Sequence, residues 1–239
     1  MNVDYSTEYH IFAHRAYTLL KRLKEEIGYP QLTIATAMVY FHRFYSLPAH
    51  TPTLYPPTLM AIVCVFLAGK VEANDGRPWT PLQTIIDKAM PTEPERDQRQ
   101  EQLITLEAIL IRALQYDFLT QHPYQIIKRQ TRGFSDDMQA VCLWLVNDSF
   151  YTPLCVKYSQ PSDVAFSVLA LGAKCFGVEG EVRPHIRELA PEVEKDVCLT
   201  LLAFYARTGR QPKNAKLLEL VEEFRKSCKS TATGFTPEC

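Results

Sequence analysis

Two stretches of this chain share one layout: PTLMAIVCVFLAGK at residues 57–70 and PSDVAFSVLALGAK at residues 161–174. In each, an alanine follows the first proline by four residues, and a lysine follows it by thirteen. Both stretches are longer than an ordinary strand and lack strict alternation, and a leading proline suits the first position of a helix. We therefore expect two buried helices, 104 residues apart, within a duplicated helical unit of about 100 residues.

Further apolar segments flank this pair, and prolines cluster between them. Several segments are apolar nearly all round, which indicates central helices enclosed by other helices. The fold class that we expect is therefore all-α. The predicted helices cover residues 5–27, which Gly28 would end, and residues 32–45, 59–71, 103–118, 138–151, 164–176, 193–206 and 216–224.

The boundary between the two units is expected at residues 121–123, because Pro123 must break or start a helix. Residues 1–121 would then hold an N-terminal helix and the first unit. Residues 122–226 would form the second unit, and residues 227–239 a short C-terminal tail. A length of 239 residues gives each unit enough chain to bury a core.

Composition and charge are those of an ordinary globular protein, with 46% apolar residues. The 26 Lys and Arg against 27 Asp and Glu give a formal charge of −1, so no broad positive field would attract nucleic acid or an anionic membrane. Seven scattered cysteines, mostly in apolar runs, indicate a reducing compartment. The chain opens without a signal pattern, and its purest apolar run, residues 59–69, is too short to span a bilayer.

The motifs of common enzymes are missing. Lys70 follows a glycine but lacks the earlier glycine and the following hydroxyl residue of a phosphate-binding loop. HRF at residues 42–44 and DFL at residues 117–119 lack the Asp and the Gly that would complete kinase signatures. No C-x-x-C, G-x-G-x-x-G or G-x-S-x-G pattern occurs. We therefore expect no catalytic residue, no metal site and no cofactor, and the chain is not itself a kinase.

Two charged residues interrupt apolar segments. At 100° per residue Glu107 falls between Leu103, Ile111 and Leu114, and Lys70 ends a charge-free run of eleven residues. An ionised carboxylate buried without partners costs several kcal/mol, so Glu107 must be paired, hydrogen-bonded, or exposed where another protein docks. One interpretation is an internal salt bridge, with Lys70 as a partner and also favoured as a cation at a helix C-terminus. The other is that both residues lie on a shared surface and bind polar groups of a partner protein.

Four motifs occur in order: QLTIATAMVYFHRFY at residues 31–45, FLAGKVE at 66–72, LEAIL at 106–110 and QHPYQ at 121–125. Together they resemble the cyclin family, specifically its transcriptional cyclin K/T branch. VNDS at residues 146–149 looks like the same place in cyclin K. The resemblance spans roughly residues 8–180 and implies two tandem five-helix cyclin boxes, preceded by an N-terminal helical segment. This architecture agrees with the repeat.

The resemblance also implies a function, that of a regulatory subunit which binds and activates a cyclin-dependent kinase of the transcriptional type. Lys70 stands at the family's interface Lys and Glu107 at its interface Glu, so these two are the candidate kinase-binding residues. The implied substrate of the complex is the C-terminal domain of RNA polymerase II, and the implied location is the nucleus. No direct nucleic-acid or membrane partner is expected.

Some departures from the family pattern limit this transfer. Ala73 stands where the family commonly has a second Glu, and His42 stands where cell-cycle cyclins have an Asp that pairs with an Arg, for which Arg15 is the counterpart here. The paired tryptophans of cyclins K and T are missing from residues 181–197. Two alternatives stay open: a scaffold cyclin that does not activate its partner, and a TFIIB-like transcription factor, which the neutral charge and missing C-x-x-C disfavour.

Overall fold

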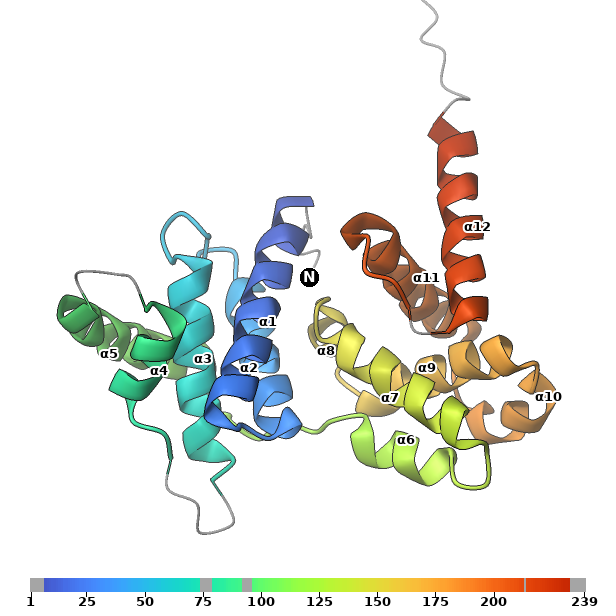
Figure 1. The fold of residues 1–239 in the computed structure, drawn as a ribbon, viewed down its shortest axis with the longest axis horizontal. Helices are drawn as coiled ribbons and strands as arrows, with labels where there is room; N and C mark the ends of the chain where they lie inside the picture. Colours follow the sequence, from blue (N-terminus) through green and yellow to red (C-terminus); the bar gives the residue numbers. More distant parts are fainter. Residues whose placement is uncertain (1–6, 74–78, 92–95, 213, 233–239) are drawn as a thin grey trace, which may run out of the picture. The chain divides into compact units, whose positions relative to one another are not determined.

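The structure of the chain is a computed structural model (Figure 1), and within the residues that it describes every regular element is a helix. This confirms the predicted all-α class. The chain divides into two compact units, the first of which reaches Gln121 and also takes in Cys155–Lys157. The second holds residues 122–154 and continues from Tyr158. The residues described are 7–73, 79–91, 96–212 and 214–232.

The described part of the first unit is built on five helices. The helix predicted at the N-terminus packs against three of the other helices, and it is therefore counted as part of this unit's bundle. Figure 1 shows the third helix in the middle of this group, and it contacts each of the other four. The helices are α1 (Thr7–Ile27), α2 (Gln31–Tyr45), α3 (Pro57–Val71), α4 (Leu82–Ala89) and α5 (Arg96–Ala113).

The central position of α3 follows from its sequence. Pro57 occupies the start of the helix, where a missing N–H costs no hydrogen bond, and the ten residues from Leu59 to Ala68 are all buried. A helix that is apolar on every side loses its solvent-accessible surface only when other helices surround it. The amphipathic α1 covers one side and ends at Gly28, whose φ of 83° favours glycine. The predicted stop at Gly28 is therefore confirmed.

The end of α5 differs from the prediction of a helix through Phe118. The helix stops at Ala113, and Gln115 and Tyr116 have φ values of 55° and 60°, which turn the backbone out of the helix. Three side chains of α2 then bind the segment that follows: Arg43 donates to the carbonyl of Asp117 at 2.9 Å, and Tyr40 donates to that of Phe118 at 2.7 Å. These long-range hydrogen bonds replace those that a continued helix would make. The third side chain, Thr36, lies 3.3 Å from the hydroxyl of Thr120.

The second unit repeats this arrangement around α9. As α3 does in the first unit, α9 begins with a proline, and it contacts α6, α7, α10 and α11. The two predicted central helices therefore start 104 residues apart, as expected. α5 and α11 also match, at 18 residues each. Its elements are α6 (Tyr124–Gln130), α7 (Asp136–Ser149), α9 (Pro161–Phe176), α10 (Glu179–Val182), the 3₁₀ helix η1 (Arg183–Ile186), α11 (Pro191–Thr208) and α12 (Ala215–Ala232). The short α8 (Leu154–Lys157) follows α7 in the chain, and all of it but Leu154 belongs to the first unit.

The last helix corrects the predicted C-terminal tail. We expected a tail from residue 227, whereas α12 continues to Ala232, and the rest of the predicted tail lies outside the described residues. α12 packs on α11 and touches α9, and its Leu217, Leu220 and Val221 are buried. Arg225 also donates to the carbonyls of Tyr205 and Ala206, near the C-terminus of α11. Apolar burial and these hydrogen bonds together hold α12 against α11.

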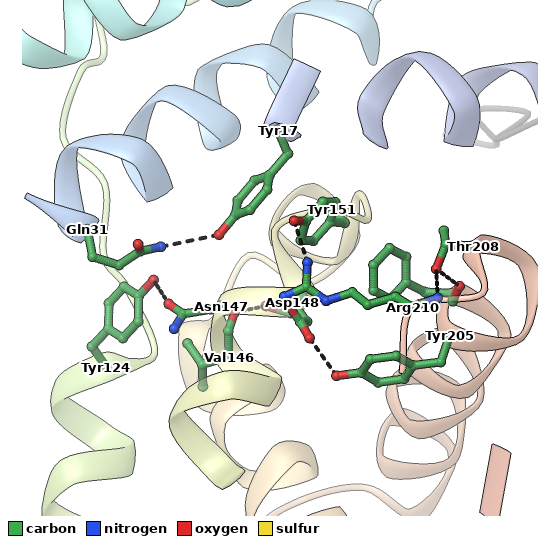
Figure 2. Close-up of polar contacts among 12 residues, drawn as sticks. Tyr17, Gln31, Tyr124, Val146, Asn147, Asp148, Tyr151, Tyr205, Thr208 and Arg210 are labelled. Atoms are coloured by element: carbon green, nitrogen blue, oxygen red, sulfur yellow. Dashed lines mark hydrogen bonds and ion pairs between the residues drawn. The ribbon is translucent and has the colours of Figure 1, made fainter. Parts of the chain in front are cut away.

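An ion pair with a buried carboxylate joins three parts of the second unit (Figure 2). Asp148, near the end of α7, is 4% exposed and lies 2.8 Å from a guanidinium nitrogen of Arg210. Tyr205 of α11 donates to the same carboxylate at 2.6 Å, and Arg210 donates to the Tyr151 hydroxyl at 2.6 Å. The carboxylate is therefore satisfied by two partners. The cluster holds the loop after α11 against the end of α7.

Candidate functional site

The two residues that the sequence singled out lie together in the first unit. Lys70 stands in the last turn of α3 and Glu107 in α5, and the Lys70 ammonium donates to the Glu107 carboxylate. This is the internal salt bridge of the first interpretation, and the structure confirms it. The pair is formed because α3 and α5 pack directly against each other.

The same pair is not sealed within the unit. The Lys70 side chain is 33% exposed and the Glu107 side chain 13% exposed. An ammonium has three donor hydrogens and a carboxylate accepts several hydrogen bonds, so each group keeps capacity after binding the other. Partner binding by Lys70 and Glu107 therefore stays a prediction, and the internal ion pair does not exclude it.

Apolar side chains surround the pair on the same surface. The Lys70 ammonium lies 4.2 Å from the centroid of the Phe66 ring, and Trp79 meets that ring edge-on at 5.8 Å. Trp79 is 53% exposed, and Ile104, one turn before Glu107 on α5, is 51% exposed. We call Lys70, Glu107, Trp79 and Ile104 the paired-charge surface. It combines two charges with exposed aromatic and aliphatic area, as the centre of a protein interface does.

A polar network beside this surface was missed by the sequence analysis. Glu72, two residues after Lys70, accepts a hydrogen bond from Thr36 of α2 at 2.7 Å. Thr36 belongs to the group on α2, with Tyr40 and Arg43, that binds the segment after α5. The signal was their spacing of four and three residues, which places three polar side chains on one side of a mostly apolar helix. The network ties the end of α3 to α2 and thereby supports Lys70.

His42, the position at which cell-cycle cyclins carry an Asp, has another partner here. Its ring is fully buried, and its Nδ1 lies 2.5 Å from the hydroxyl of Tyr9 on α1. Arg15, the counterpart suggested by the resemblance, is exposed on α1. The His42 contact therefore docks α1 on α2 through a tyrosine. A local sequence pattern could not reveal this, because the two residues are 33 positions apart.

The described residues hold neither a metal cluster nor a membrane-spanning helix. No three His, Cys, Asp or Glu side chains come close enough there to hold a metal ion. None of the helices described is both long enough and apolar enough to cross a membrane. Ala73, the departure from the family's second Glu, is exposed just after α3.

Comparison with known proteins places this chain. Residues 8–119 match the N-terminal domain of cyclins. The chain is 31% identical to putative cyclin-T1-1 of Arabidopsis thaliana over 177 residues, which cover 67% of this chain and 68% of that protein. It is 28% identical to cyclin-K of Danio rerio over 199 residues, which cover 75% of this chain and 46% of that protein. The chain spans less than half the length of the first curated relatives that it matches.

A solved structure extends the likeness to the second unit. A chain in the crystal structure of the yeast RNA Pol II CTD kinase CTDK-1 complex superposes with a TM-score of 0.73, at 13% identity. The match covers 95% of this chain and 78% of that chain, so the two share a fold. The matched cyclin domain and the cyclin-T and cyclin-K relatives lead to one conclusion: the chain belongs to the cyclin family, in its transcriptional K/T branch.

Proposed function

We propose that this cyclin is a regulatory subunit that binds and activates a cyclin-dependent kinase of the transcriptional type. The observation that carries the proposal is the paired-charge surface, on which Lys70 and Glu107 meet with exposed apolar side chains beside them, and the resemblance implies that these two stand at the family's interface positions. The chain itself supplies binding energy, and the chemistry of phosphoryl transfer takes place in the partner.

Activation follows from differential binding. A kinase has inactive and active conformations, and a partner that binds the active one more tightly shifts the population toward it. The partly exposed Lys70 ammonium and the mostly buried Glu107 carboxylate would hydrogen-bond kinase backbone groups, and Trp79 and Ile104 would cover apolar surface around them. Since α3 and α5 are packed together and α3 is tied to α2 by Glu72 and Thr36, this surface is preorganised before the kinase arrives.

We propose the C-terminal domain of RNA polymerase II as the substrate of the complex, and hence a nuclear location. The support is the shared fold with a chain of the yeast RNA Pol II CTD kinase complex, together with the cyclin-K and cyclin-T relatives. A scaffold cyclin, which binds a kinase without activating it, is the alternative outcome of the experiment below.

The experiment is co-purification from cells, followed by a kinase assay with a polymerase-tail peptide. Recovery of an active cyclin-dependent kinase supports the proposal, whereas a stable but inactive complex would favour the scaffold. Reproducible DNA binding without a kinase would favour the TFIIB-like alternative. The partner identified in this way can then be titrated against variants of the paired-charge surface.

Lys70→Ala and Glu107→Ala should each weaken kinase association by about 10-fold or more, since a hydrogen bond to a charged group contributes roughly 1.5–3 kcal/mol. The matched controls are Lys216→Ala and Glu219→Ala, which break an exposed ion pair on α12 and should leave kinase binding unchanged. Denaturant unfolding of each free variant is the accompanying measurement. A loss of more than about 3 kcal/mol would show that the pair serves the stability of the fold instead.

A further inference from the structure

The exposed side of α6 and of the turn after it carries charge of a single sign. Lys128, Arg129 and Arg132 are all exposed, and Ile127, on the opposite side of α6, is fully buried. Lys128 and Arg129 stand in the last turn of α6 and Arg132 in the turn directly after it, so the three cations follow one another closely at the C-terminal end of this helix. We call them the basic face. The exposed charges of α12, in contrast, have both signs, and the whole chain has a formal charge of −1.

A second element adds to the basic face. The Nδ1 atom of His185 in η1 lies 2.9 Å from the side-chain oxygen of Gln130, the last residue of α6. The His185 ring also meets the Phe134 ring at 6.3 Å. These contacts hold η1 beside the end of α6, and exposed Arg187 follows directly after η1. Two segments more than 50 residues apart therefore bring basic side chains to one region of the second unit.

The four basic side chains of this region are not neutralised by carboxylates of the described residues. Over the described part of the chain, Lys128, Arg129, Arg132 and Arg187 form no ion pair, whereas the neighbouring Arg183 binds Glu194 at 2.9 Å. An anion that approached the basic face would not need to break an existing salt bridge. The helix dipole accounts for cations in the last turn of α6, at Lys128 and Arg129. It does not account for Arg132 and Arg187, which lie outside the helix.

We propose that the basic face binds a phosphorylated segment of the kinase substrate, an inference that rests on the proposed function. A phosphate group carries a charge of about −1.5 to −2 and three acceptor oxygens, and the guanidinium groups of Arg129 and Arg132, three positions apart in the chain, match it in charge and in donors. Once one repeat of a polymerase tail is phosphorylated and held here, further repeats stay at high local concentration around the kinase. The second box would then favour tails that already carry phosphate.

Two carboxylates follow the basic face in the chain, and their removal provides a second prediction. Asp136 and Asp137 begin α7, four residues or more after Arg132, and both are exposed. Their negative charge repels an anion bound at Arg132. Asp136→Asn with Asp137→Asn should therefore tighten the binding of a phosphorylated peptide, opposite in direction to any loss of Arg129 or Arg132.

The direct test measures the affinity of the full chain for a polymerase-tail peptide with and without one phosphoserine, by fluorescence anisotropy at low and physiological salt. The wild-type chain should bind the phosphorylated peptide at least 5-fold more tightly. Arg129→Glu with Arg132→Glu should abolish this preference, while Lys195→Glu with Arg207→Glu, exposed on α11, should keep it. Equal binding by the wild type and the Arg129/Arg132 variant would overturn the proposal. Displacement of the phosphorylated peptide by a single-stranded RNA of the same net charge would also overturn it, because the basic face would then be a nucleic-acid site.

The kinase complex supplies an independent readout. With the phosphorylated tail as substrate, KM should rise several-fold in the Arg129/Arg132 variant at unchanged kcat, and KM for the unphosphorylated tail should not change. A complex that phosphorylates the plain tail but shows no such KM effect contradicts this inference and leaves the proposed function standing. Phosphopeptide binding by the free chain without any activity of the complex supports the basic face and contradicts the proposed function.

Discussion

At the scale of the residue, Gln115 and Tyr116 are in an uncommon backbone conformation. Both have positive φ, at 55° and 60°, where a side chain other than glycine costs roughly 1–2 kcal/mol. The surrounding contacts hold them there, because Arg43 donates to the carbonyls of Leu114 and Asp117 on either side. The strain is thus maintained by tertiary hydrogen bonds from α2.

Replacing Gln115 with glycine should stabilise the protein by about 0.5–1 kcal/mol. Glycine removes the cost of the left-handed conformation, which exceeds the cost of its greater freedom in the unfolded chain. Gln115 is exposed, so no buried contact is lost. Urea unfolding of the two proteins measures the difference. Gln121→Gly, at an exposed position without positive φ, should instead destabilise, and the same sign for both variants would contradict the explanation.

At the scale of the element, α7 and α9 approach closely because Gly172 has no side chain. A Cβ atom added at Gly172 would lie 2.5 Å from the sulfur of Cys142, well inside the van der Waals distance. The first repeat has Gly69 near the same place, one position later in the repeat than Gly172. The neighbour of Gly69 is the ring of Tyr29. Each central helix therefore has a glycine near its end against which another side chain packs, in a different way in each unit.

Gly172→Ala should destabilise the second unit by about 1–3 kcal/mol, the usual range for overpacking a buried site. Cys142→Ala in the same chain removes the sulfur and should recover most of that loss, whereas Cys142→Ala alone should leave a small cavity. A double-mutant cycle from thermal or urea unfolding gives the coupling energy. Additive effects of the two changes would show that the helices do not meet at this point.

At the scale of the whole molecule, the buried titratable groups predict how stability depends on pH. Burial lowers the pKa of His122 to about 4 and raises the pKa of Cys142 to about 12 and that of Cys175 to about 11. Between pH 6.5 and 4 the unfolded chain binds a proton at His122 that the folded chain does not, so stability falls as pH decreases. Above pH 9 the unfolded thiols lose protons that the folded ones keep, so stability falls as pH rises.

The expected profile is a plateau from about pH 6.5 to 9 with a decline on each side. His122 alone should account for a loss on the order of 1–2 kcal/mol by pH 5. Urea unfolding at several pH values gives the profile, and His122→Gln should flatten its acidic side without altering the alkaline one. An unchanged acidic slope in that variant would assign the decline to other groups.

Much of the fold was predictable from local sequence. The ten consecutive buried residues of α3, the proline starts of α3 and α9 and the stop of α1 at Gly28 depend on neighbours in the chain, and these were confirmed. The helices α4, α6, α8, α10 and η1 were missed, since they are short and lack a long apolar run. The predicted end of α5 was wrong, because hydrogen bonds from α2 override a helical pattern that continues in the sequence through Phe118.

The all-helical class and the repeat of about 100 residues could be read from the sequence, because helix propensity and apolar patterning act over a few neighbouring residues. It also drew attention to Lys70 and Glu107, as charges in apolar surroundings. Helix packing was needed to show that these two bind each other, that Tyr9 is the partner of His42, and that Gln130 and His185 join α6 to η1. Each of these contacts joins residues 33 to 55 positions apart, and the packing of whole helices brings them together.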